Sequence, residues 1–162
     1  MSSTKSHKNN IIVYTDGSFS KSKNGIKAGY GIYFPNKEHK NYSKPFTHEP
    51  ITNQRAELYA IYKTLSVINK KFTFDSLHIY TDSEYSIKSL TIWIKNWKKN
   101  NWKGAKNKEV LNQDIIKNID LILEKYKKKI FFHHVRSHTG KQDEHSIGND
   151  MADQLATQGA NK

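Results

Sequence analysis

The chain has 162 residues, of which 35% are hydrophobic, and this is enough for one domain with a buried core. It contains no cysteine, which excludes disulfide bonds, thiolate metal sites and a cysteine nucleophile, so any metal ligand has to be oxygen or nitrogen. The net charge of +12 favours a polyanionic partner such as nucleic acid, although a genome biased toward Lys and Asn would produce the same excess.

The first residues carry no recognisable targeting signal. Residues 1–9 are polar and basic, lack the apolar stretch of a signal peptide, and are expected to form a flexible tail. No segment approaches the roughly 18 apolar residues of a membrane span. We therefore expect an intracellular, monomeric protein of the cytoplasm or nucleus that is not secreted, with a single domain over residues 10–160.

Apolar runs predict the elements in chain order. Residues 11–15 and 29–34 predict two strands joined by a hairpin connection over residues 17–27, and residues 42–47 predict a third strand. From Asn53 the apolar spacing becomes helical, with Thr52 or Asn53 placed to cap the helix.

The second half alternates between strands and helices. The predicted elements are a strand at 77–81, helices at 83–90 and 110–126, a strand at 130–135 and a helix at 149–158. Three early strands followed by this alternation imply an α/β protein, with a mixed sheet and helices packed on it.

Two near-copies of one phrase place an acid after an apolar run. Asp16 follows Val-Tyr-Thr and Asp82 follows Ile-Tyr-Thr. A carboxylate is tolerated at the end of a buried strand because water or a cation can solvate it there, so two such ends side by side suggest a metal site. The alternative is that Asp16 opens an Asp-Gly turn and that Asp82 caps the next helix.

Four acidic motifs resemble those of the type 1 ribonucleases H, in the same order. The acids are Asp16, Glu57, Asp82 and Asp153, and the sequence Arg-Ser-His-Thr-Gly around His138 precedes the last of them. The resemblance covers residues 11–160. It implies the ribonuclease H-like fold, a mixed five-stranded sheet of three antiparallel strands and then parallel strands, with helices on both faces.

The resemblance also implies an activity. The protein would be an endoribonuclease that hydrolyses the RNA strand of RNA/DNA hybrids and leaves 5′-phosphate and 3′-hydroxyl ends. Such hydrolysis needs an activated water and relief of charge on the leaving oxygen, which two divalent ions can provide. The four acids would hold two Mg²⁺ ions, with Mn²⁺ as an alternative, and His138 would assist proton transfer or product release.

Two acids compete for the fourth ligand position. Asp150 and Asp153 lie one helical turn apart, and either could instead stabilise the helix dipole. We choose Asp153 because the Gly-Asn-x-x-Ala-Asp pattern ends there. The segment from His138 to Asp153 is longer than in the resembling family, and residues 141–145 look like an insert.

Aromatic and basic residues gather at 93–106, which contains all three Trp with Lys between them. Rings among ammonium groups suit a nucleic-acid backbone, and the segment resembles the family's basic protrusion, here near residues 91–106, which grips the DNA strand. The alternative is that Trp93 and Trp97 form a packed pair four residues apart.

Further substrate contacts come from the resemblance alone. It assigns Asn53 and Gln54 to the RNA strand, and Thr52 and Asn112 to a pocket for a DNA phosphate whose customary Arg is replaced by Pro50. With Asn24 as another RNA contact, the expected substrate-binding residues are Asn24, Thr52, Asn53, Gln54, Trp93, Trp97 and Asn112.

Two other functions remain open. The same acids occur in resolvases and integrases that cut DNA, and competition between duplex DNA and hybrid would distinguish that function. A hybrid-binding module without catalysis is the third, and the presence of all four acids argues against it.

Overall fold

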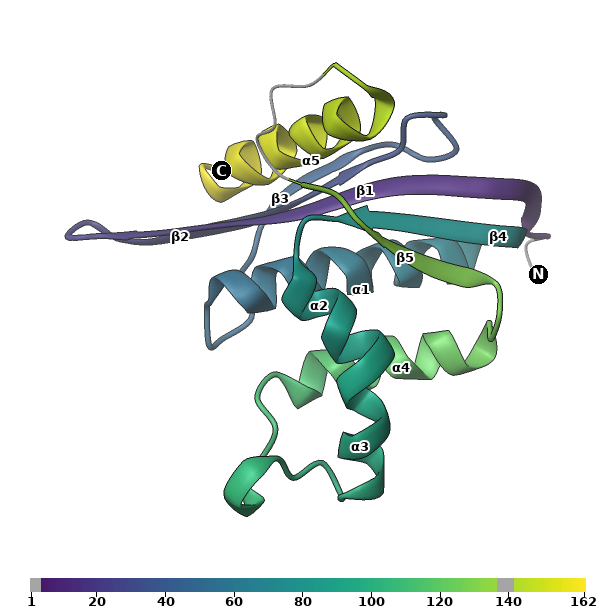
Figure 1. Ribbon diagram of the computed structural model, residues 1–162. Coiled ribbons are helices and arrows are strands. Elements are labelled where there is room, and N and C mark those ends of the chain that lie inside the picture. The colour runs from purple at the N-terminus through teal and green to yellow at the C-terminus, as the bar shows by residue number, and fades with distance from the viewer. Residues whose placement is uncertain (1–3, 137–141) are drawn as a thin grey trace.

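A five-stranded mixed sheet forms the centre of the protein in a computed structural model that describes residues 4–136 and 142–162 (Figure 1). The strand order is β3-β2-β1-β4-β5. β1, β2 and β3 pair antiparallel, whereas β4 is parallel to β1 and to β5. The strands are β1 Ser6–Ser22, β2 Gly25–Tyr33, β3 Tyr42–Pro45, β4 Phe72–Thr81 and β5 Ile130–His134. This arrangement confirms the predicted sheet.

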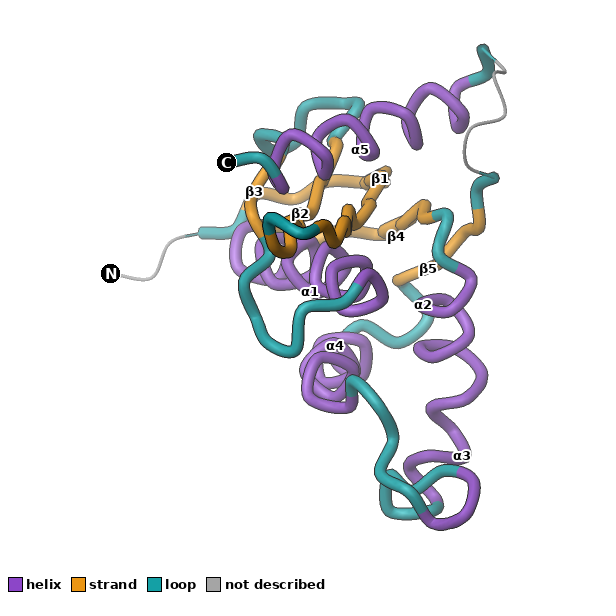
Figure 2. Tube along the Cα trace, turned by 90° about the vertical axis from the view of Figure 1, so that its left-hand side faces the viewer, coloured by secondary structure: helices purple, strands orange, loops and turns teal. Residues whose placement is uncertain are grey.

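Helices cover both faces of this sheet, as predicted. α5 lies alone on one face, over β1, β2 and β3, while α1 covers the other face and α4 packs against α1 (Figure 1). The helical elements are α1 Asn53–Lys71, α2 Glu84–Lys88, a π-helical turn η1 Ser89–Trp93, α3 Ile94–Lys99, a 3₁₀ turn η2 Ala105–Asn107, α4 Gln113–Lys125 and α5 Glu144–Ala160. α3 and the loop after it extend away from the sheet (Figure 2).

The core lies between the sheet and α1. Ile11 and Val13 of β1 and Leu58 and Ile61 of α1 are fully buried. The start of α1 is fixed by Thr52, whose Oγ1 accepts a hydrogen bond from the Arg55 N–H at 3.1 Å. Of the two predicted caps, the structure therefore selects Thr52.

β1 is longer than the sequence pattern indicated. It begins at Ser6, inside the range 1–9 expected as a tail, and pairs there with β4. It also continues past Asp16 to Ser22, so the predicted hairpin connection over residues 17–27 is wrong and only Lys23 and Asn24 form the turn. The antiparallel pairing with β2 supplies hydrogen-bond partners for the backbone of this polar stretch. A prediction based on apolar runs does not detect a strand that is stabilised in this way.

The last helix also begins earlier than predicted. α5 starts at Glu144, not at residue 149, because Asp143 Oδ1 accepts a hydrogen bond from the Ser146 N–H at 2.9 Å and caps it. The end of the expected insert is therefore the cap and first turn of this helix. In the described part of the chain, no helix combines the length and apolar character needed to cross a membrane.

Candidate active site

Asp16 lies within β1, not at the end of a strand as predicted. Its partner in β2 is Gly31. On the other side the parallel pairing with β4 ends at Tyr14 and Tyr80, and β4 itself ends at Thr81. Asp16 therefore lies beside the end of β4, and Asp82 is the first residue after that end. The predicted juxtaposition of the two acids holds, although only Asp82 stands at a strand end.

Glu57 reaches the same place from α1. A Cβ built on Gly17 would stand 2.5 Å from the Glu57 nitrogen, so the strand and the helix approach each other backbone to backbone. The Gly17 N–H donates to Asp16 Oδ1 at 2.9 Å. A glycine after Asp16 thus brings the helical acid against the strand acid.

These three acids form one cluster. Each of Asp16, Glu57 and Asp82 offers a carboxylate oxygen, and these oxygens all lie within 4.8 Å of one another. Burial and repulsion from Asp82 raise the pKa of Asp16 to about 8. Burial and repulsion from the other two acids hold the pKa of Glu57 well above its usual range. Neighbouring cations would relieve this repulsion.

The chemistry of the cluster suits a divalent cation. Glu57 Oε2 is buried and has no hydrogen-bond partner within the described residues. A buried carboxylate oxygen without a partner is costly, and coordination to a cation removes that cost. Three carboxylates without sulfur or imidazole ligands match the preference of Mg²⁺ and similar hard ions.

Asp153, on α5, acts on this cluster through Asp16. Its carboxyl group contributes to the raised pKa of Asp16. Asp150, one turn earlier, is not among the groups with the largest effect on the pKa of Asp16. The predicted His138 lies outside the described residues.

Four of the predicted substrate contacts lie at the start of α1 or on the β1–β2 hairpin: Thr52 for the DNA strand, and Asn53, Gln54 and Asn24 for the RNA strand. Thr52, Asn53 and Gln54 have exposed side chains at the start of α1, about one turn before Glu57. Asn24 lies at the tip of the β1–β2 hairpin, eight residues from Asp16 and therefore about 26 Å away along the strand. The structure thus does not bring Asn24 to the carboxylate cluster.

Asn112 precedes α4 and is held by a residue that we did not predict. Its backbone is left-handed, with φ of 65°, and its Nδ2 donates to the Tyr85 hydroxyl at 2.9 Å. Tyr85 is three residues after Asp82 and belongs to α2. The sequence offered one signal for this contact, namely that Tyr85 is aromatic and lies about one helical turn after Asp82, a predicted metal ligand.

The three Trp side chains form a row along the protruding segment. Ring centroids are 6.0 Å apart for Trp93 and Trp97 and 6.1 Å apart for Trp97 and Trp102. Trp93 is 38% exposed, whereas the other two are partly buried. Trp93 is therefore presented to solvent, whereas Trp97 and Trp102 pack against the core.

Lys98, one of the basic residues in this segment, forms ion pairs within the protein. Lys98 Nζ lies 2.6 Å from Asp120 and 3.0 Å from Glu124, both on α4. These ion pairs join α3 to α4 and orient the segment, so Lys98 has acidic partners within the protein.

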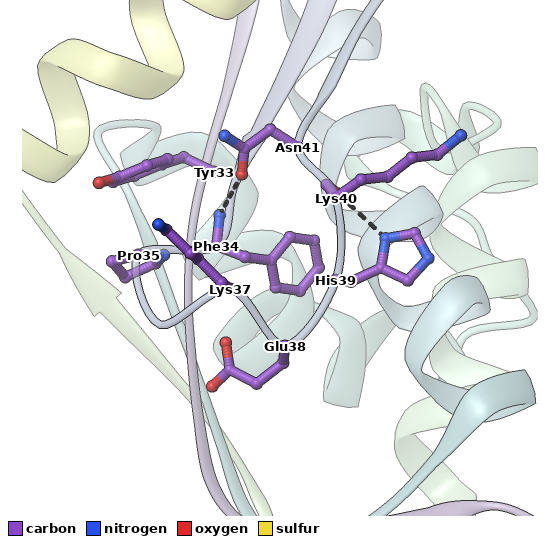
Figure 3. Close-up of a pocket in the computed structure, with 8 residues that line it drawn as sticks. All are labelled: Tyr33, Phe34, Pro35, Lys37, Glu38, His39, Lys40 and Asn41. Atoms are coloured by element: carbon purple, nitrogen blue, oxygen red, sulfur yellow. Dashed lines mark hydrogen bonds between the residues drawn. The ribbon is translucent and has the colours of Figure 1, made fainter.

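A cavity elsewhere in the structure does not contain the cluster. A volume of about 540 Å³ lies at the connection between β2 and β3, where Asn41 Oδ1 accepts a hydrogen bond from the Phe34 N–H at 2.8 Å (Figure 3). Its side chains carry mixed charge, with Glu38 among Lys37 and Lys40. Among the predicted site residues that the structure describes, none lines this cavity.

Comparison with known proteins matches the chain to one family. The sequence profile of the RNase H family matches residues 8–161. Ribonuclease H of Schizosaccharomyces pombe is 38% identical over 93% of this chain, and ribonuclease H of Francisella philomiragia is 38% identical over 92%. The chain spans 53% of the S. pombe protein and 90% of the Francisella protein.

A solved structure shares the fold. The foamy viral protease-reverse transcriptase in complex with RNA/DNA hybrid aligns with a TM-score of 0.75 and 28% identity, over 93% of this chain and 20% of the viral one. Together with the ordered acids and the mixed sheet, these matches show that the chain belongs to the ribonuclease H family.

Proposed function

We propose that this protein cleaves the RNA strand of RNA/DNA hybrids with the help of divalent metal ions. The observation that carries the proposal is the cluster of Asp16, Glu57 and Asp82, whose carboxylate oxygens lie within 4.8 Å of one another. Membership of the ribonuclease H family supports the substrate, as does the related viral enzyme that was solved with a hybrid.

The proposed cofactor is Mg²⁺, held as two ions by Asp16, Glu57, Asp82 and Asp153. When bound, these ions would supply an activated water and neutralise charge on the scissile phosphate and the leaving oxygen. The four carboxylates come from β1, α1, the end of β4 and α5, so the fold fixes their relative positions before substrate arrives. The products would carry 5′-phosphate and 3′-hydroxyl ends.

Side chains around the cluster would hold the two strands of the hybrid. Asn53 and Gln54 are exposed beside Glu57, where amide groups can reach the 2′-hydroxyls of RNA across a shallow minor groove. Trp93, on the protruding segment, presents a ring to the DNA strand.

Cleavage of end-labelled hybrid tests this proposal. Wild-type protein should cut hybrid in Mg²⁺, leave RNA/RNA and DNA/DNA intact, and lose activity in EDTA or as Asp82→Asn. Ligation of the products and their shift after phosphatase treatment identify the ends. Cutting of duplex DNA would favour the resolvase-type function, and binding of hybrid without any cutting would favour a binding module.

A further inference from the structure

The side chain of Arg55 joins the first turns of two helices. Its Nη1 donates to Asp114 Oδ1 at 2.8 Å and its Nη2 donates to Asp114 Oδ2 at 2.9 Å. Nη2 also donates to the Glu49 carbonyl oxygen at 3.2 Å, in the segment that leads into α1. One guanidinium group therefore fixes the start of α4 and the approach to α1.

The two helix ends joined by Arg55 carry the proposed phosphate-binding pair. The Arg55 N–H donates to Thr52 Oγ1 at 3.1 Å, and Asp114 lies two residues after Asn112 in the chain. Thr52 and Asn112 belong to different elements, so they can serve one phosphate only while those elements keep their relative position. The backbone N–H of Arg55 binds Thr52 at the start of α1. The guanidinium group of Arg55 binds Asp114, two residues after Asn112, at the start of α4.

This contact is better suited to fixing geometry than to adding stability. Arg55 is only 3% exposed, and removing a guanidinium from water offsets much of the attraction to its partner. Within the described residues its Nε is buried without a hydrogen-bond partner. A planar fork on a carboxylate fixes distance and orientation together, which a lysine ammonium group cannot do.

The choice of arginine is itself notable in this sequence. The chain has 27 Lys and Arg residues, and Arg55 is one of only two arginines. Most basic positions in the chain are lysine, and an arginine stands at this bidentate contact.

We propose that Arg55 is a positioning residue, which acts through Asp114 to hold Thr52 and Asn112 in register for one phosphate of the DNA strand. This inference rests on the proposed function, because it concerns how the same site grips its hybrid. Arg55 does not touch the substrate itself. Its loss should therefore weaken the hold on one phosphate while leaving the carboxylate cluster in place.

The test is a scan of hybrids that each carry one uncharged methylphosphonate in the DNA strand. Binding is measured on an Asp82→Asn background so that the hybrid stays intact. One position should weaken binding to the Arg55-containing protein by roughly tenfold, because a charge-assisted hydrogen bond is lost. In Arg55→Lys and Asp114→Asn that penalty should fall below about threefold, and the salt dependence of binding should decrease by about one phosphate contact.

Asn69→Ala is the matched control. Asn69 Oδ1 accepts hydrogen bonds from Lys125 Nζ at 2.8 Å and from the Tyr126 hydroxyl at 2.6 Å, so it joins α1 to the end of α4 far from Thr52. Its loss should lower stability but retain the full methylphosphonate penalty. Arg55→Lys in the active protein should raise KM several-fold and leave kcat within about twofold, whereas a purely structural role would lower the active fraction and spare KM.

The outcomes separate this inference from the proposed function. If Arg55→Lys fails to fold by circular dichroism, Asp114→Asn provides the same comparison. A sensitive phosphate that stays equally sensitive in both variants, or no sensitive phosphate at all, overturns the positioning role. Cleavage of unmodified hybrid by the wild type is a separate measurement, and its failure would count against the proposed function instead.

Discussion

Gly17 and Glu57 are in contact through their backbones. A Cβ on Gly17 would lie 2.5 Å from the Glu57 nitrogen and 2.7 Å from the Ala56 carbonyl carbon, closer than real side chains approach. The strand acid Asp16 and the helix acid Glu57 are thus brought together by the absence of a side chain. The spacing of the cluster depends on this contact as much as on the acids themselves.

Gly17→Ala should therefore disrupt the metal site. The added methyl group has to push α1 away from β1, and overpacking of this kind costs about 1–3 kcal/mol. We expect a lower free energy of unfolding in urea and a weaker affinity for Mn²⁺ or Mg²⁺ in calorimetry. Gly104→Ala is the control, because its nearest neighbour would be 3.8 Å from the new Cβ. Wild-type metal affinity in Gly17→Ala would show that the contact does not set the spacing of the acids.

The stability of the metal-free protein should fall as pH rises from about 4 to 8. Burial and repulsion from Asp82 raise the pKa of Asp16 from its usual 3.8 to about 8. Between these values the folded state binds more protons than the unfolded state, so the free energy of unfolding decreases with pH and levels off above that range. Urea unfolding in EDTA measures this slope. Asp16→Asn should flatten it, and an unchanged slope in that variant would assign the effect to other groups.

Asp82→Asn should separate stability from metal binding. Removing one of the clustered negative charges relieves repulsion, so the variant should be at least as stable as wild type in EDTA. Mg²⁺ should raise the melting temperature of the wild type, because it binds the folded state, and should raise that of the variant little or not at all. Thermal unfolding with and without Mg²⁺ checks both parts. An equal Mg²⁺-dependent gain in the variant would remove Asp82 from the ligand set.

The order of the elements and the pairing of Asp16 with Asp82 could be predicted from the sequence, because both depend on local signals. Apolar runs identified every strand, and helical spacing from Asn53 identified α1. The resemblance then assigned Glu57 and Asp153, which no strand-end argument would have selected.

The remaining features depend on pairing between distant segments. The extension of β1 past Asp16 is stabilised by its ladder with β2, and residues 17–22 alone contain no apolar run. Arg55 binds Asp114, which is 59 residues later in the chain. Asn112, just before α4, forms a hydrogen bond with Tyr85 of α2. Such contacts are set by tertiary structure, which the local pattern does not encode.

The exposed and packed Trp residues should respond differently to truncation. Trp93 is 38% exposed, so Trp93→Ala should weaken hybrid binding by a factor of about 5 to 100, the range for losing one stacking contact, with little loss of stability. Trp97 lies between Trp93 and Trp102, so Trp97→Ala should mainly destabilise the protruding segment. Fluorescence anisotropy with labelled hybrid and urea unfolding provide the two readouts. The reverse pattern would assign substrate contact to Trp97.

Asp153→Asn and Asp150→Asn should differ although the two residues lie one turn apart on α5. Asp153 contributes to the raised pKa of Asp16, whereas Asp150 is not among the groups with the largest effect on that pKa. Asp153→Asn should therefore lower the cleavage rate by at least about 100-fold and weaken metal binding, because the proposed function makes Asp153 an oxygen ligand of the metal ions. Asp150→Asn keeps the helix and its partial burial, so its rate should stay within about threefold of wild type. Single-turnover cleavage at saturating hybrid measures both, and full activity of Asp153→Asn together with loss in Asp150→Asn would move the fourth ligand to Asp150.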